Sequence, residues 1–135
     1  MTDDERRAAN QQVLATVLDT VSAGKFEQLA DLVTDDLVFE LPYGPDFIPN
    51  PIIGREPWNE MQLMTFKLFS SFALSLIEVH ECIDPDELIA EYRSEAVVVR
   101  NGNAYKNRYI GVFRFRDGKI ATWREFHNPE ATKVL

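Results

Sequence analysis

The residues best suited to chemistry lie near the end of the chain, in the stretch 119–129. This stretch alternates in the way that a β-strand does, because successive side chains of a strand point to opposite faces of the sheet. Trp123, Glu125 and His127 are therefore predicted to share one face. Asn128-Pro129 ends the strand, since proline has no N–H to donate to a neighbouring strand.

A carboxyl group between an indole and an imidazole is suited to proton transfer. If this face is covered, burial disfavours the charged form of Glu125 and raises its pKa. A carboxyl of that kind donates and accepts protons near neutral pH. We predict Glu125 and His127 as the catalytic residues, with His127 orienting a carbonyl group or stabilising developing charge. The alternative is a solvated face, or a Glu125 that pairs with an arginine, and the residue pattern leaves it open.

Other kinds of chemistry lack their sequence signatures. The chain has no Gly-rich phosphate loop, no His-Glu-x-x-His, no Gly-x-Ser-x-Gly and no cysteine pair. Its two histidines, His80 and His127, have no close spacing, so we predict no metal site and no cofactor. Cys82 is interpreted as a small buried hydrophobe. Proton chemistry and simple binding remain.

The bulk composition predicts one domain, residues 1–135, long enough to bury a core without disulfides. The net charge of −8 and the pI of about 4.7 argue against nucleic acid, whose phosphates would be repelled, and against anionic membrane surfaces. The charged N-terminus has no apolar run behind it, and no run of about eighteen apolar residues occurs. We therefore expect a cytoplasmic protein with no membrane partner.

Helices are predicted mainly in the first half of the chain. Apolar residues at helical spacing predict a helix over 2–22, a short one over 26–33 and a third over 55–72. The third helix is apolar almost all round, which favours a place between the sheet and a loop or partner. A strand is predicted over 37–41.

Residues 42–54 form a predicted surface loop with four prolines. The loop also carries apolar side chains, among them Tyr43, that are unfavourable in water. It is interpreted as a lid, as a dimer contact or as a segment packed over the edge of its own core, and we favour the last.

Strands are predicted in the second half, where the apolar period changes to two. The predicted strands cover 73–81, 88–99, 105–115 and 119–127. Asn101-Gly102 and Asp117-Gly118 between them are typical of tight hairpin turns. In the first strand, uninterrupted alternation places Leu74, Leu76, Glu78 and His80 on one face. Helices followed by strands predict an α+β fold, with helices on one face of an antiparallel sheet.

Several segments carry a family resemblance. Residues 32–39 before the proline-rich loop, Gly54-Arg55-Glu56 opening a helix, and 112–120 near the end together resemble the nuclear transport factor 2-like superfamily, and within it the SnoaL-like group. The resemblance implies a cone in which a curved antiparallel sheet packs on three N-terminal helices. It also implies an apolar pocket at the wide end and, usually, a homodimer.

The predicted pocket takes a small, largely apolar molecule that carries a carbonyl group. The residues predicted to line it are Tyr43, Trp58, Met61, Asn107, Tyr109, Phe113 and Trp123. The last four follow from the shared face of the two final strands, which alternation and the resemblance both indicate.

Within the superfamily, ketosteroid isomerase chemistry is not supported. The positions that resemble that family's general base, oxyanion-binding acid and oxyanion tyrosine hold Leu41, Gly111 and, near the third, Val17. The tail 124–129, Arg-Glu-Phe-His-Asn-Pro, is similar to the phenazine-biosynthesis A/B proteins. There the glutamate of such a tail is an acid/base residue in condensing two cyclic amino-ketones, which implies the same role for Glu125.

Two hypotheses follow. In the first, the protein is a cofactor-free isomerase, cyclase or condensing enzyme that uses Glu125. In the second, it is a ligand-binding or accessory dimeric protein that catalyses nothing.

Overall fold

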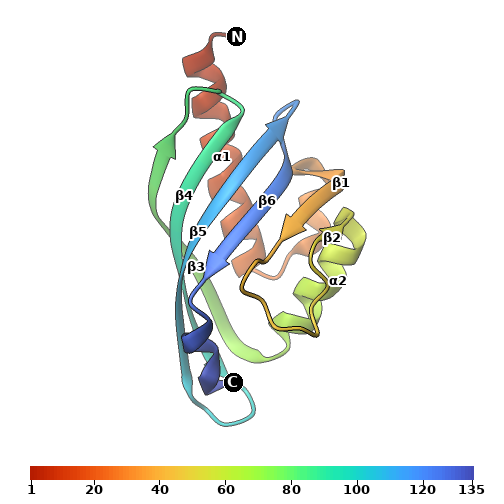
Figure 1. Ribbon diagram of the computed structural model, residues 1–135, viewed down its shortest axis with the longest axis vertical. Helices are drawn as coiled ribbons and strands as arrows, with labels where there is room; N and C mark the ends of the chain where they lie inside the picture. The colour runs from red at the N-terminus through yellow and green to blue at the C-terminus, as the bar shows by residue number, and fades with distance from the viewer.

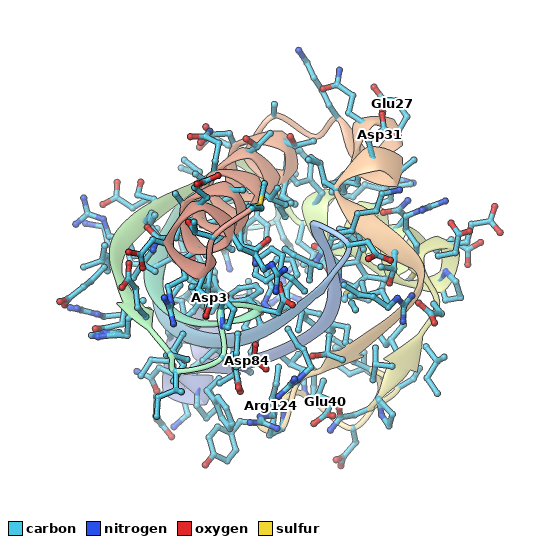
Figure 2. All side chains as sticks on the ribbon, turned by 90° about the horizontal axis from the view of Figure 1, so that it is seen from above. Asp3, Glu27, Asp31, Glu40, Asp84 and Arg124 are labelled. Carbon is cyan, nitrogen blue, oxygen red and sulfur yellow. The ribbon has the colours of Figure 1, made fainter.

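The computed structural model, which describes residues 1–135, opens on helix α1 (Asp3–Ser22), and the sheet curves around this helix (Figures 1 and 2). The Thr2 hydroxyl caps α1 by accepting a hydrogen bond from the Glu5 N–H at 3.1 Å. Acidic residues fill the first turn, where the helix dipole favours negative charge. The apolar residues that α1 buries in the main core are Leu14, Val17, Leu18 and Val21. The helix predicted over 2–22 is confirmed.

A six-stranded sheet forms the rest of the framework (Figure 1). After α1, the elements are η1 (Phe26–Asp31), β1 (Val33–Glu40), β2 (Ile52–Ile53), α2 (Arg55–Phe66), β3 (Phe69–Glu81), β4 (Glu87–Val98), β5 (Ala104–Arg116), β6 (Lys119–His127) and η2 (Pro129–Val134). The strand order is β2-β1-β6-β5-β4-β3, and all neighbours are antiparallel except β1 and β6. This arrangement confirms the predicted α+β fold, with the short helix before β1 wound as a 3₁₀ helix.

Helix α2 is shorter than its apolar spacing predicts. It ends at Phe66 rather than at residue 72, and β3 begins at Phe69. The Phe69 ring stacks on Tyr105 with centroids 5.2 Å apart, and Phe69 pairs with Val98 across the sheet. Pairing with a long neighbouring strand outweighs the helical propensity of this segment. One side of α2 also remains open, with Met64 72% exposed, so the predicted sandwiched position is wrong.

Strand β3 contains a bulge that changes the predicted faces. Its register with β4 shifts between Leu76 and Glu78. Val79 consequently lies opposite the buried Ala90, while His80 is exposed and lies with Glu91 on the outer face. The prediction that His80 shares a face with Leu76 is therefore wrong, because one extra residue in a strand reverses the alternation beyond it.

The main core lies between α1, the start of α2 and the inner face of the sheet. It contains residues from almost every element, among them Phe39, Trp58, Leu88, Phe113 and Trp123. None of the helices is long and apolar enough to cross a membrane. The homodimer and the cytoplasmic location stay predictions.

Candidate active site

The pairing of β5 with β6 sets the candidate site. Opposite one another lie Tyr109 and His127, Gly111 and Glu125, and Phe113 and Trp123. Trp123 is buried and Glu125 and His127 are half-buried, whereas Arg124 is exposed. Figure 2 shows Arg124 on the outer side of the sheet, away from α1. The predicted alternation of the last strand is therefore confirmed.

A cavity of about 730 Å³ opens against this face. Sixteen of its 24 lining residues are hydrophobic, which suits an apolar ligand with a few polar contacts. The lining residues from the sheet are Phe39, Phe69, Phe72, Leu74, Val98, Tyr105, Tyr109, Trp123, Glu125 and His127. Met61 lines it from α2, and Leu41 and Ile48 line it from the segment after β1. Glu125 is the only acidic side chain in the lining.

Glu125 is held by a hydrogen bond from the neighbouring strands. The Tyr92 hydroxyl donates to Glu125 Oε1 at 2.5 Å, and Trp123 Nε1 donates to the Tyr92 oxygen at 3.0 Å. Gly111 makes this approach possible, because a Cβ there would lie 2.9 Å from the Tyr92 oxygen and 2.5 Å from the Phe113 ring. A side chain at position 111 would displace the phenol from beneath Glu125.

Burial raises the pKa of Glu125 from its ordinary value of 4.5 to about 7, and the hydrogen bond from Tyr92 opposes part of this rise. Oε2 has no hydrogen-bond partner in the protein and is not among the buried unpaired atoms, so it remains accessible from the cavity. A carboxyl with such a pKa and an accessible oxygen exchanges protons with a bound molecule near neutral pH. This geometry excludes a solvated surface position or an arginine pair for Glu125.

The raised pKa makes the stability of the fold depend on pH. The folded protein keeps the Glu125 proton up to about pH 7, whereas the unfolded chain releases it near 4.5. The unfolded state therefore binds fewer protons between these values, and the free energy of unfolding falls as the pH rises through this window, by about 3 kcal/mol from this group.

Glu125→Gln has no titrating group at this position, so it lacks this loss. We expect the stability of the variant relative to the wild type to rise by about 3 kcal/mol between pH 4 and pH 8. Urea unfolding of both proteins at the two pH values measures this difference, and a difference that does not change with pH would contradict the buried carboxyl.

His127 presents a second polar group to the cavity. Its Nδ1 is buried and makes no hydrogen bond, while Nε2 is not among the buried unpaired atoms. Burial lowers the pKa of His127, so the imidazole is neutral at pH 7. A neutral ring with an accessible Nε2 can make one hydrogen bond to a ligand.

A separate hydroxyl network lies beside the cavity. The Tyr109 hydroxyl bonds to Ser94 at 2.8 Å and to the Tyr105 hydroxyl at 3.4 Å. Asn107 Nδ2 donates to the Tyr105 oxygen at 2.7 Å, and the Asn107 amide also exchanges two hydrogen bonds with the backbone of Asn128. This network fixes the end of β6, where His127 lies.

Four of the predicted pocket residues lie outside the cavity lining, whereas Met61, Tyr109 and Trp123 lie within it. Asn107 is buried, and its amide is occupied by the hydroxyl network and the backbone. Trp58 and Phe113 are fully buried behind Trp123, with ring centroids 5.5 and 5.0 Å from it. These two residues form the support of the cavity wall because packing layers place them one shell deeper.

Tyr43 is the fourth of these corrections. It is 59% exposed, and its ring packs on Phe126, which alternates to the opposite face of β6 from Glu125. Other residues of the same loop, Phe47 and Ile48, do line the cavity. The loop thus covers the edge of the core as we favoured, and Tyr43 covers the outer side of it.

The sequence analysis missed Tyr92 as a partner of Glu125. Alternation along 88–99 does place Tyr92 on the face opposite the charged residues. It cannot show that β4 and β6, on either side of β5, bring Tyr92 and Glu125 together. The glycine at position 111 was the available signal, since a glycine within a strand often marks a close approach of another group.

A second titratable cluster lies on the outer face. His80 Nε2 is 2.8 Å from a Glu91 oxygen and 3.9 Å from Glu78, and Arg108 contacts the other Glu91 oxygen at 3.4 Å. The hydrogen bond to Glu91 raises the pKa of His80. This exposed group is a network of surface ion pairs, separate from the cavity lining.

Comparison with known proteins agrees with this architecture. The model of the SnoaL-like domain family matches residues 14–123. The chain belongs to this family. An uncharacterized PhzA/B-like protein of Pseudomonas aeruginosa is 32% identical to this SnoaL-like protein over 120 residues, which cover 88% of this chain and 84% of the relative.

Solved structures show the same fold. A Bacillus subtilis protein provisionally described as an isomerase superposes with a TM-score of 0.83 at 26% identity, covering 99% of this SnoaL-like chain and 94% of that one. An NTF2-like protein from Anabaena variabilis superposes with a TM-score of 0.77 at 23% identity, covering 95% and 94%. The predicted nuclear transport factor 2-like fold is therefore confirmed.

Proposed function

We propose that this SnoaL-like protein is a cofactor-free acid/base enzyme, an isomerase, cyclase or condensing enzyme for a small, largely apolar carbonyl compound. The observation that carries the proposal is the Glu125 carboxyl, which has a pKa of about 7 and lies in the wall of an apolar cavity. An acid/base group works best when its pKa is close to the working pH. The likeness to a provisionally described isomerase supports the same class of reaction.

The reaction needs two polar contacts. The Glu125 carboxylate removes a proton from the carbon next to the substrate carbonyl, and the electrons of that C–H bond move toward the carbonyl oxygen. His127 Nε2, in the tautomer that carries a proton there, donates a hydrogen bond to that oxygen and stabilises its developing charge. Neutral Glu125 then returns the proton at another atom, so the cycle consumes no cofactor.

Hydrogen exchange of simple ketones tests this proposal without knowledge of the natural substrate. We expect the protein to accelerate exchange of the hydrogens next to the carbonyl of small cyclic ketones in D₂O, followed by proton NMR. Met61→Trp, which places a large ring in the cavity, should abolish the acceleration. Arg124→Gln, on the outer face of the same strand, should leave it unchanged.

The result also decides between the two hypotheses. Ketones that bind and shift the NMR signals of cavity residues, but exchange no faster than in buffer, would contradict the enzyme and support the binding protein.

A further inference from the structure

The hydrogen bonds around Tyr92 run in one direction only. An indole N–H donates and never accepts, so the Tyr92 oxygen accepts from Trp123 Nε1 at 3.0 Å. The phenol proton then points to Glu125 Oε1 at 2.5 Å. The reverse arrangement, with a proton on Oε1 donated to Tyr92, would leave the phenol proton without an acceptor, because fully buried Tyr92 has no other partner.

The packing holds Tyr92 in this position. Its ring stacks on Tyr109 with centroids 5.1 Å apart and an interplanar angle of 17°, and it also contacts Phe113. The hydroxyl lies over Gly111, where a Cβ would come within 2.9 Å. The phenol therefore has neither space nor a second acceptor to turn toward, and Oε1 accepts its proton whether Glu125 is charged or neutral.

The geometry points to Tyr92 and Trp123 as positioning residues that reserve Oε1 of Glu125 for a fixed hydrogen bond and leave Oε2 as the atom that exchanges the proton with the ligand. This inference rests on the proposed function. It follows from three observations: a donor-only indole, a buried phenol with one available acceptor, and an Oε2 that has no protein partner and remains accessible from the cavity. Neither Tyr92 nor Trp123 transfers a proton itself.

Tyr92→Phe tests the inference, because it keeps the ring and removes the hydroxyl. The hydrogen bond favours the charged carboxylate, so its loss should raise the pKa of Glu125, by about one unit. Carbon-detected NMR titration of the ligand-free protein measures this pKa. The pH profile of ketone hydrogen exchange should move to higher pH by the same amount, with a smaller change in the ketone concentration needed for half-maximal rate.

Trp123→Phe and Tyr109→Phe complete the experiment. Trp123→Phe removes the indole N–H that polarises the phenol, so it should raise the pKa of Glu125 by less than Tyr92→Phe does. Tyr109→Phe removes a hydroxyl that makes no bond to Glu125, so it should leave that pKa unchanged. If Tyr92→Phe fails to fold, Trp123→Phe carries the test.

The outcomes separate this inference from the proposed function. An unchanged pKa of Glu125 in folded Tyr92→Phe, or a raised pKa with an unmoved pH profile, would overturn the positioning role. Absence of ketone exchange by the wild type would instead overturn the proposed function, and with it the transfer through Oε2.

Discussion

Glu125→Gln should lower the turnover of a processed carbonyl compound by a factor of about 10² or more. Glutamine has nearly the shape of glutamate and keeps an oxygen that accepts the Tyr92 hydrogen bond, so the fold and the affinity for the ligand should be retained. What is lost is the group that takes up and returns a proton at Oε2. The measurement is the rate at saturating ligand, together with the dissociation constant, for wild type and variant.

Glu95→Gln is the matched control for this experiment. Glu95 is exposed on β4, where Tyr92 and Ser94 are buried, so its carboxylate lies on the outer face of the same sheet. The same chemical change there should leave turnover as it is. Equal turnover by wild type and Glu125→Gln, on a compound that the wild type processes, would refute the role of Glu125.

The second large effect concerns stability. Trp58→Ala should lower the free energy of unfolding by about 3–5 kcal/mol, as large-to-small changes of fully buried aromatic residues do. Trp58 is 0% exposed, and its ring lies 6.1 Å from Phe39 and 5.5 Å from Trp123, so it joins α2 to the sheet strands β1 and β6. Its loss leaves a cavity behind the wall that contains Glu125.

Trp58→Phe is the control that separates packing from hydrogen bonding. The Trp58 Nε1 makes no hydrogen bond, so phenylalanine loses only volume and should cost much less than alanine. Urea unfolding of the three proteins gives the comparison. A loss for Trp58→Ala below about 1 kcal/mol would show that the site collapses around the missing ring, and would contradict a rigid wall behind Trp123.

Local rules in the sequence determined which residues share a face. A strand alternates with period two wherever it is regular, so the order of residues alone places Trp123, Glu125 and His127 together. The turn at Asp117-Gly118 is equally local. Both of its residues have positive φ, 52° and 78°, which is the backbone that this pair of residue types favours in a tight hairpin.

Only the tertiary structure decided what those faces contact. The end of α2, the bulge in β3 and the outward position of Tyr43 depend on pairing and packing with distant segments, and local spacing does not encode these. The same holds for the hydrogen bond from Tyr92 to Glu125, which joins residues 33 apart in the chain across the row that Gly111 leaves open. The sequence by itself thus determined that a carboxyl faces inward, and the register of three neighbouring strands decided which of its oxygens is held and which one faces a ligand.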